Sequence, residues 1–380
     1  MRVLVAPDSY KGSLTAAEVA ACMEKGILDV LPQAAVIKLP IADGGEGTVD
    51  AIVNATGGQL HQVEVLGPLG EPVTATFGVM GDGQTAVVEM ASASGLLLIA
   101  KDRLNPLRTT TYGTGQLIQA ALDQGCRRIV IGIGGSATND GGAGMAQALG
   151  VRFFNDQGSE LSYGGGELIS LSRVDVSGLD PRVADCEIIV ASDVTNPLCG
   201  PEGASFVFGP QKGATPEMAQ RLDDGLRNYG RVIHERLGID VRNVPGAGAA
   251  GGLGAGLIAF LSARMSRGID IVLEAIEFEK RVQEADLVIT GEGRTDSQTA
   301  FGKAPAGVAA LAKKYNKPVI CVSGGISLDT KALHEAGIDV IIGATQSPMS
   351  LEEAMANASD WIRHAVASVI RTSLLPINRG

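Results

Sequence analysis

Apolar and polar positions form the same repeating pattern at the two ends of the chain. Short apolar runs predict strands at Arg2–Ala6, Val36–Leu39, Leu287–Thr290, Val319–Val322 and Val340–Ile342. Segments with helical spacing lie between or after the last three runs, at Pro305–Lys314, Thr330–Ala336 and Leu351–Ile370. Such strands alternating with helices are typical of a parallel sheet covered on both faces. We therefore expect the two ends to form one five-stranded, flavodoxin-like, doubly wound α/β domain.

The first helix has a recognisable start. Thr15 and Glu18 have the spacing of a capping box, in which each residue bonds the backbone N–H of the other. Val19, Met23 and Ile27 then recur at helical spacing, which predicts one buried stripe.

The middle of the chain has a different pattern. Closely spaced strands joined by glycine turns predict an antiparallel meander, at Val63–Leu66, Val73–Val79 and Thr85–Glu89. Further predicted strands mix with helices, at Ile129–Ile133, Val151–Phe154 and Ile188–Ala191. We expect a mixed α/β domain over 59–281, inserted into the flavodoxin-like domain of 1–58 and 282–380, with the active-site cleft between them.

The segment Gly246–Ala263 has no charged residue and approaches the length of a membrane helix. Its six glycines favour a different interpretation, a glycine-rich turn that leads into a buried helix at Leu257–Ala263.

Composition narrows the class of partner. Hydrophobic residues make up 45% of the 380 positions, which excludes general disorder. The net charge of −11 argues against a nucleic-acid partner, because phosphate backbones are bound by basic faces. The five cysteines lack CxxC spacing and are typical of reduced thiols in a cytoplasmic protein. We expect no secretory leader and no membrane partner, and both a monomer and a homodimer stay open.

Glycines, acids and hydroxyls follow five of the predicted strands. These loops read APDSYKGS (6–13), IADGGEGT (41–48), GGSATNDGG (134–142), SDVTNP (192–197) and GEGRTDS (291–297). In an open α/β sheet, ligands bind beyond the carboxyl ends of the strands. Glycine turns let backbone N–H groups converge on an anion, and carboxylates with hydroxyls suit Mg²⁺. One such loop would more simply be a turn with a helix N-cap, but five of them indicate phosphate and metal handling.

Four cationic side chains could neutralise a transferred phosphate or a substrate carboxylate: Lys11, Lys212, Arg294 and Lys303. A solvated loop lysine is an equally good interpretation of Lys212. The sequence has no GxxxxGK[ST] signature, so it is no P-loop enzyme. The four histidines lie outside these loops, which argues against a histidine-based triad or metal site.

Eight segments carry a family resemblance: APDSYKGSLTA (6–16), LPIADGGEGT (39–48), GTGQLI (113–118), GIGGSATNDGGAG (132–144), DVTNPLCG (193–200), FGPQKGA (208–214), GAAGGLGAG (248–256) and GEGRTDSQT (291–299). Together they resemble the bacterial glycerate kinase family, in the group that acts in glucarate and glyoxylate catabolism. Tyr10 stands where that pattern often has phenylalanine. The resemblance implies ATP as cosubstrate, Mg²⁺, (R)-glycerate as acceptor and 2-phosphoglycerate as product. It also implies a flavodoxin-like domain interrupted by a second α/β domain.

Residue chemistry gives the candidate roles. Asp193 is the first candidate to orient or deprotonate the acceptor hydroxyl, although an Asx turn before Pro197 explains it equally well. Asp296 and Glu292 are each candidates for a Mg²⁺ ligand or for the base instead, and Asp193 is a further candidate ligand. The catalytic candidates are Asp193, Asp296 and Lys11. Candidate substrate contacts are Asp8, Ser9, Asp43, Glu46, Asn196, Arg294 and Lys303. Candidate nucleotide and phosphate contacts are Gly134, Gly135, Ser136, Thr138, Asn139, Asp140 and Lys212.

Two other functions stay open at this point. One is a kinase that gives 3-phosphoglycerate or acts on another small hydroxy acid or sugar acid. The other is a non-catalytic regulator that binds a nucleotide or metabolite, which would bind ATP without glycerate-dependent release of ADP.

Overall fold

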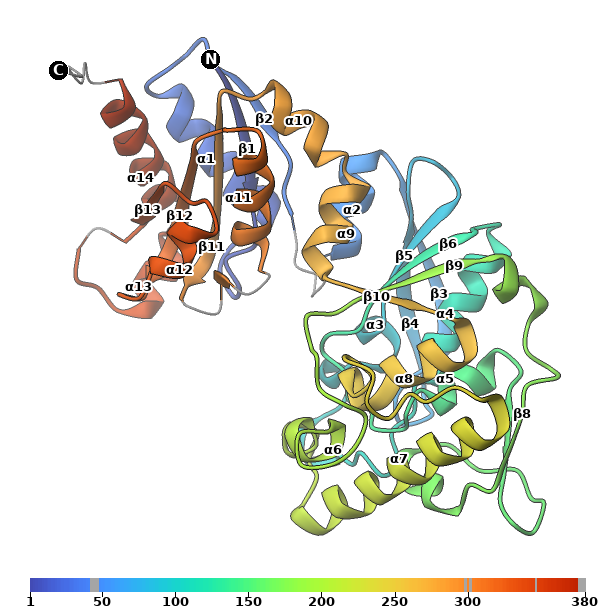
Figure 1. Cartoon of the computed structure of the whole chain (residues 1–380). Helices are drawn as coiled ribbons and strands as arrows, with labels where there is room; N and C mark the ends of the chain where they lie inside the picture. The colour runs from blue at the N-terminus through green and yellow to red at the C-terminus, as the bar shows by residue number, and fades with distance from the viewer. Residues whose placement is uncertain (42–47, 297–298, 301–302, 346, 375–380) are drawn as a thin grey trace. The chain divides into compact units, whose positions relative to one another are not determined.

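The chain folds into two compact units (Figure 1). The computed structural model describes residues 1–41, 48–296, 299–300, 303–345 and 347–374. The first unit comprises residues 1–43 and 269–380, and the second comprises residues 44–268. Each unit has its own sheet and its own apolar core.

The first unit is built on a parallel sheet with the strand order β13-β12-β11-β1-β2. This order confirms the flavodoxin-like prediction for the chain ends. The strands are β1 (Arg2–Pro7), β2 (Ala35–Lys38), β11 (Leu287–Thr295), β12 (Val319–Ile326) and β13 (Val340–Gly343). The helices are α1 (Ala16–Leu28), α9 (Gly268–Ala275), α10 (Phe278–Glu284), α11 (Ala304–Lys314), α12 (Lys331–Glu335), α13 (Leu351–Ala356) and α14 (Ala358–Ser373).

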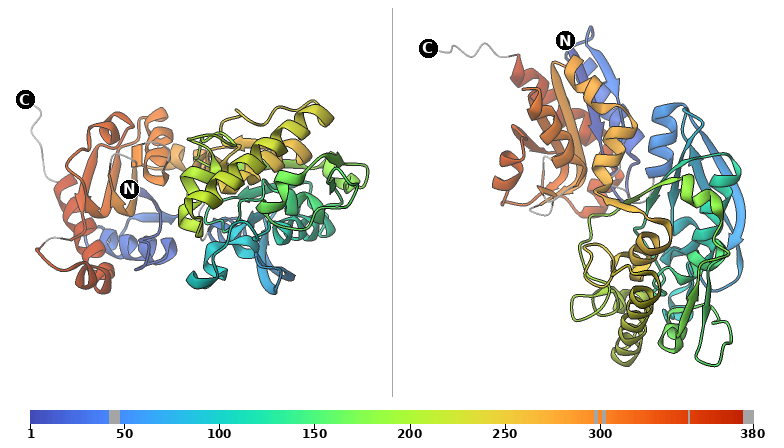
Figure 2. Two further views of the ribbon diagram at one scale, coloured as in Figure 1. Left: turned by 90° about the horizontal axis from the view of Figure 1, so that it is seen from below. Right: turned by 45° about the vertical axis from the view of Figure 1, so that its right-hand side comes forward.

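Both faces of this sheet are covered, which explains why its strands show no polar alternation. Val3 and Val5 of β1 belong to an apolar cluster with side chains of α1 and α14, whereas Leu4, equally buried, points to the opposite face. Helices α1 and α14 pack on each other, and α11 contacts β11 and β12. Figure 2 shows helices on both sides of the strands.

The helix ends follow local sequence signals. The capping box of α1 is present, with Thr15 N–H donating to Glu18 Oε2 at 2.8 Å and Glu18 N–H donating to Thr15 Oγ1 at 3.3 Å. The expected single helix over Leu351–Ile370 is wrong. It is two helices, α13 and α14, which meet at Asn357, and Ser350 with Glu353 forms a second capping box at the start of α13.

The second unit contains a mixed sheet with the order β10-β9-β6-β5-β4-β3. The expected meander is confirmed, because β3, β4 and β5 pair antiparallel, whereas β5, β6, β9 and β10 pair parallel. The strands are β3 (Gln59–Leu66), β4 (Pro72–Val79), β5 (Thr85–Glu89), β6 (Arg128–Gly132), β9 (Glu187–Ala191) and β10 (Arg264–Ser266), with a separate pair β7 (Arg152–Phe154) and β8 (Arg173–Asp175). The helices are α2 (Thr48–Thr56), α3 (Ala91–Ser94), α4 (Tyr112–Asp123), α5 (Ala143–Ala148), α6 (Ala204–Phe208), α7 (Pro216–Leu237) and α8 (Ala249–Leu261).

The uncharged glycine-rich segment contains the whole of α8, and the predicted glycine turn into a buried helix is confirmed, although the helix ends at Leu261 and not at Ala263. Ala250, Gly251 and Gly252 have φ values of 53°, 69° and 89° and form a kink at the helix start. This kink packs on the loop after β6, where the Cβ of an alanine at Gly251 would lie 2.0 Å from the Thr138 carbonyl oxygen. In the described part of the chain, no helix has both the length and the apolar character needed to cross a membrane.

The division between the units differs from the expected boundaries at 58/59 and 281/282. Helix α2 packs on β3, β4 and β5, which places it in the second unit. Ile269 of helix α9 belongs to the first unit and packs closely on α11. A Cβ added at Gly307 of α11 would lie 2.4 Å from the Cγ1 atom of Ile269. Neither contact leaves a signal in the sequence of α2 or α9 taken alone.

Candidate functional site

The carboxyl ends of four parallel strands in the first unit surround a cavity of about 920 Å³. The loop after β1 supplies Asp8, Ser9 and Lys11, and the end of β11 supplies Glu292 and Arg294. Lys303, directly before α11, completes this polar side. The structure therefore brings six of the residues named from the sequence to one cavity: Asp8, Ser9, Lys11, Glu292, Arg294 and Lys303.

The loop after β1 is held by backbone and side-chain hydrogen bonds. Asp8 Oδ1 accepts a bond of 2.6 Å from the Ser9 N–H, and Tyr10 N–H donates to the Leu14 carbonyl oxygen at 2.8 Å. Tyr10 O–H donates to the Val322 carbonyl oxygen of β12 at 2.9 Å. Burial raises the pKa of Tyr10 well above its ordinary value, so its hydroxyl acts as a donor. The loop is thus fixed to the sheet, while Lys11 stays exposed at its turn.

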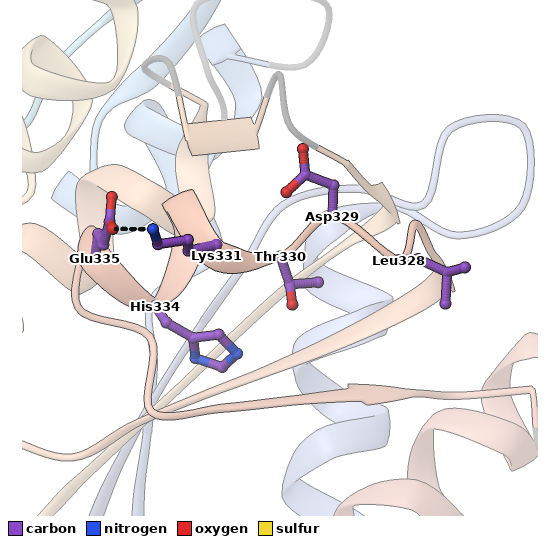
Figure 3. Close-up of a pocket in the computed structure, with 6 residues that line it drawn as sticks. All are labelled: Leu328, Asp329, Thr330, Lys331, His334 and Glu335. Atoms are coloured by element: carbon purple, nitrogen blue, oxygen red, sulfur yellow. Dashed lines mark ion pairs between the residues drawn. The ribbon is translucent and has the colours of Figure 1, made fainter.

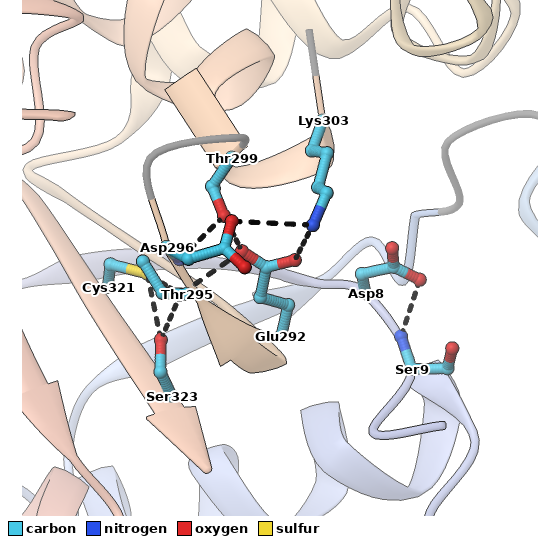
Figure 4. Close-up of polar contacts among 9 residues, drawn as sticks. All are labelled: Asp8, Ser9, Glu292, Thr295, Asp296, Thr299, Lys303, Cys321 and Ser323. Atoms are coloured by element: carbon cyan, nitrogen blue, oxygen red, sulfur yellow. Dashed lines mark hydrogen bonds and ion pairs between the residues drawn. The ribbon is translucent and has the colours of Figure 1, made fainter. Parts of the chain in front are cut away.

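Glu292 is a carboxylate of the cavity that two threonine hydroxyls hold (Figure 4). Its Oε1 accepts hydrogen bonds from Thr299 Oγ1 at 2.6 Å and from Thr295 Oγ1 at 3.1 Å. Burial raises the pKa of Glu292, and the Thr299 hydroxyl and the Lys303 ammonium partly offset that effect. A carboxylate with a raised pKa is a better proton acceptor than an ordinary one, provided it is still ionised at the working pH.

Lys303 lies between two carboxylates. Its Nζ is 3.9 Å from Glu292 Oε2 and 4.0 Å from Asp296 Oδ1 (Figure 4). The backbone N–H of Asp296 donates to Thr299 Oγ1 at 3.2 Å, which ties Asp296 to the same threonine that bonds Glu292. Lys303 therefore balances the charge of both acids at the polar side of the cavity.

A hydroxyl and thiol network lies beneath Glu292. Thr295 Oγ1 is 2.5 Å from Ser323 Oγ and 3.9 Å from Cys321 Sγ. Burial raises the pKa of Cys321 to about 11, so this thiol stays protonated at neutral pH and is no nucleophile. The network orients Thr295, which in turn donates to Glu292.

The loop after β6 in the second unit is held by a buried lysine. Lys212, 1% exposed, has its Nζ 2.7 Å from Ser136 Oγ and 2.6 Å from the Thr138 carbonyl oxygen. The interpretation of Lys212 as a solvated loop lysine is therefore wrong. Burial lowers the pKa of Lys212 to about 7, and the charge of Asp140 opposes that shift.

Asp140 and Asn139 are buried in the same loop. Asp140 accepts hydrogen bonds from the N–H and the hydroxyl of Thr111 and from the N–H groups of Gly142 and Gly144. Burial raises the pKa of Asp140, and these bonds oppose the effect. Asn139 Nδ2 donates to Ser205 Oγ at 3.0 Å. The side chains of 136–140 thus shape the loop from inside, whereas Gly134 and Gly135 at its start are exposed.

The remaining predicted residues fall into two groups. Asp193, exposed, and Asn196, whose Nδ2 donates to the Glu202 carbonyl oxygen at 2.7 Å, lie in the loop after β9 of the second unit. Asp43 and Glu46 lie outside the described residues. Among the residues that the structure describes, no group of three or more His, Cys, Asp or Glu side chains converges as a metal site.

Sequence reasoning did not identify all of the residues that line the cavity. Its lining includes Gly324 and Gly325 in the last part of β12 and Thr345 after β13. Ser323-Gly324-Gly325 follows a predicted strand with the same residue types as the other loops, so this signal was available. The apolar lining from the segment after β13, including Leu351, had no such signal.

A second hollow lies at the start of α12 (Figure 3). It is lined by Leu328, Asp329, Thr330, Lys331, His334 and Glu335. Lys331 Nζ pairs with Glu335 Oε1 at 3.8 Å across one helical turn, and His334 Nδ1 is 2.7 Å from the Ile338 carbonyl oxygen. These contacts are those of a solvated helix surface, and we assign the hollow no function.

Comparison with known proteins identifies the family. The sequence profile of the glycerate kinase family matches residues 3–374. A glycerate kinase of Bacillus subtilis (strain 168) is 54% identical over 369 residues, 97% of each chain. A glycerate 2-kinase of Escherichia coli (strain K12) is 52% identical over 372 residues, 98% of each chain. A crystal structure described as a candidate glycerate kinase 2 from Salmonella typhimurium LT2 is 51% identical, covers 98% of both chains and superposes with a TM-score of 0.88. The chain therefore belongs to the glycerate kinase family, as an enzyme that phosphorylates a hydroxyl group.

Proposed function

We propose that this enzyme phosphorylates (R)-glycerate with ATP and Mg²⁺ and releases 2-phosphoglycerate and ADP. The observation that carries the proposal is the cavity of the first unit, where Lys11, Arg294 and Lys303 line one space with Asp8 and Glu292. Three cations can neutralise an anionic acid and a transferred phosphoryl group, both of which an overall acidic protein would otherwise repel. The similarity to a glycerate 2-kinase at 52% identity favours the 2-phosphate as product.

The transfer needs positioning and charge neutralisation more than covalent chemistry. One hydroxyl oxygen of glycerate forms the new bond to the γ-phosphorus as the bond from that phosphorus to ADP breaks. The hydroxyl proton passes to a carboxylate. Asp193 is our first candidate for this acceptor, with Asp296 and Glu292 as alternatives. Lys11, Arg294 and Lys303 would stabilise the charge on the phosphoryl oxygens or hold the glycerate carboxylate.

The loop after β6 would contribute through its backbone. The polar side chains from Ser136 to Asp140 are buried, and those of Ser136, Asn139 and Asp140 are hydrogen-bonded within the second unit, whereas Gly134 and Gly135 are exposed. Exposed glycine N–H groups are suited to a phosphate oxygen. In this proposal Lys212 acts as a positioning residue, because it bonds Ser136 and Thr138 and not the exposed end of the loop.

The donor set of the first unit fits Mg²⁺. This ion needs only one or two protein carboxylates, because phosphate oxygens and water complete its coordination. Glu292 and Asp8 line the same cavity and could hold it, and Asp193 is the further candidate from the second unit. When bound with ATP, the ion would offset charge on the phosphates.

³¹P NMR of the product made from ATP, Mg²⁺ and D-glycerate tests activity and regiochemistry together. We expect a phosphate resonance coupled to the single proton on C2, with ADP formed in equal amount. A resonance coupled to the two protons on C3 would replace the 2-phosphate by 3-phosphoglycerate. If ADP forms only with another hydroxy acid or sugar acid in a substrate panel, the glycerate assignment is wrong.

Two substitutions test the carboxylates. Asp193→Asn and Asp296→Asn should each be compared with Asp329→Asn, an acid of the shallow hollow at α12. Loss of a general base costs about 10²- to 10⁴-fold in kcat. If both of the first two variants keep wild-type kcat, neither carboxylate is the proton acceptor.

A further inference from the structure

One side of the first-unit cavity has a chemistry that phosphate handling does not explain. Five of its lining residues form what we call the apolar wall: Ile326, Met349, Leu351, Met355 and Trp361. Ile326 is 39% exposed and Leu351 is 77% exposed. Large aliphatic side chains that gather at the rim of a cavity are typical of contact with an apolar part of a ligand.

The size of the cavity also exceeds what the acceptor needs. Its volume of about 920 Å³ is typical of sites for ligands far larger than a three-carbon acid. Each carbon of glycerate carries either the carboxylate or a hydroxyl group, and these groups would lose hydration against aliphatic side chains. The apolar wall therefore serves another molecule.

Gly325 of β12 gives an independent indication of ligand contact. A Cβ at this position would meet no protein atom within 4 Å, and the residue lines the cavity. Its neighbour Gly324 is required by packing, because a Cβ there would lie 2.5 Å from the Gly293 carbonyl oxygen. Gly325 has no such reason within the fold, and a glycine with open space beside it allows the close approach of a ligand.

We propose that the apolar wall binds the adenine base of the nucleotide, with its phosphates directed toward Lys11, Arg294 and Lys303. The inference rests on the proposed function for ATP as the phosphoryl donor. An adenine nucleotide has an apolar, flat base at one end and a polyanion at the other, which matches the two sides of this cavity. The polar side chains of the loop after β6, from Ser136 to Asp140, are buried, so they offer a base no surface.

The position of Trp361 makes the proposal directly measurable. It is the single tryptophan of the chain and lies in the apolar wall. Its emission should change on titration with ADP, and calorimetry should give the same Kd. Tripolyphosphate, which lacks the base, should bind more weakly than ATP. Calorimetric binding of ADP with no change in Trp361 emission would overturn the proposal.

Three variants separate the apolar wall from a general surface effect. Leu351→Gln removes an aliphatic contact at an exposed position, and Gly325→Val fills the open space in a strand, where a β-branched residue is tolerated. Leu328→Gln is the matched control, because Leu328 is fully exposed and does not line this cavity. The first two should raise the Kd for ADP by about three- to tenfold, as expected for losing one or two methylene contacts.

The outcomes distinguish this inference from the proposed function. If Leu351→Gln and Gly325→Val bind ADP as tightly as Leu328→Gln does, the base lies elsewhere, whatever the acceptor. Suppose instead that ADP binds to wild type and that Leu351→Gln and Gly325→Val weaken this binding as expected, but that glycerate causes no release of ADP from ATP. The nucleotide site would then be supported, and the proposal that glycerate is the acceptor would be wrong. Kd values equal for ATP and tripolyphosphate would also refute base recognition.

Discussion

The contact between the kink of α8 and the loop after β6 allows a sharp test of how glycine is used in the second unit. Gly251 and Gly57 have almost the same left-handed φ, 69° and 68°. A Cβ at Gly251 would lie 2.0 Å from the Thr138 carbonyl oxygen, whereas a Cβ at Gly57 would meet nothing within 4 Å. Gly251→Ala and Gly57→Ala therefore both place an alanine at a left-handed φ but differ in the space available.

The expected magnitudes follow from these contacts. A left-handed alanine costs about 1–2 kcal/mol of unfolding free energy at either site. At Gly251 the backbone must also move, and such overpacking costs typically about 1–3 kcal/mol more. Movement weakens the bond from Gly141 N–H to the Gly251 carbonyl oxygen, 3.0 Å, and the bond from Lys212 to Thr138, each worth about 1 kcal/mol. We expect Gly251→Ala to be less stable than Gly57→Ala by about 2–4 kcal/mol.

Urea unfolding followed by circular dichroism measures the difference as a shift of the transition midpoint. Trp361 lies in the first unit, so its emission reports that unit alone, and a transition in the second unit should leave it nearly unchanged if the units unfold separately. Equal midpoints for Gly251→Ala and Gly57→Ala would refute the reasoning. They would mean that the loop after β6 relaxes away from the kink at no cost.

Three further predictions concern buried polar groups. Burial raises the pKa of Glu292, so ionisation of this group destabilises the wild-type fold. Glu292→Gln should therefore unfold at a higher urea concentration than wild type at pH 8. The difference between the two midpoints should disappear below the ordinary pKa of 4.5. Burial lowers the pKa of Lys212 to about 7, against 10.5 in the unfolded chain. The free energy of unfolding of wild type, relative to that of Lys212→Met, should therefore increase as the pH rises from about 7 to 10. A difference that does not depend on pH would contradict the burial of this amine. Tyr10→Phe leaves the Val322 carbonyl oxygen without its 2.9 Å bond and should lower the unfolding free energy by about 1–2 kcal/mol in urea titrations.

The topology of the first unit was predictable because its strands are buried on both faces. Val3, Leu4 and Val5 are all apolar and all buried. A continuous apolar run of this kind predicts a central strand, because side chains on both faces of such a strand are buried. The break at Asn357 was not predictable in the same way. Leu351–Ile370 keeps helical periodicity across the junction, and the second capping box lies at Ser350, before the break. The apolar wall depends on this short α13, so its composition could not be read from periodicity.

The polar side of the cavity could be predicted because parallel strands end at one edge of the sheet. Asp8 after β1 and Glu292 in β11 are far apart in sequence, but the two strands pair directly, with Ala6 opposite Thr290. In the second unit the same reasoning placed Asp140 among phosphate contacts, and the positive charge of Lys212 placed it there too, but the structure shows both side chains buried. Sequence shows that a polar residue follows a strand, but not whether its side chain turns outward or into the core.

The glycines of this chain show why such loops are ambiguous. A glycine can be required because a neighbouring backbone lies where its Cβ would be, as at Gly251, or because a ligand approaches, as we infer at Gly325. Both uses give a glycine-rich sequence, so glycine content alone does not distinguish a glycine required by packing from one at a ligand site. What separates them is the content of the space beyond the missing Cβ: protein at Gly251, and the open cavity at Gly325. A substitution that fills that space should therefore destabilise the fold in the first case and weaken nucleotide binding, with the fold intact, in the second.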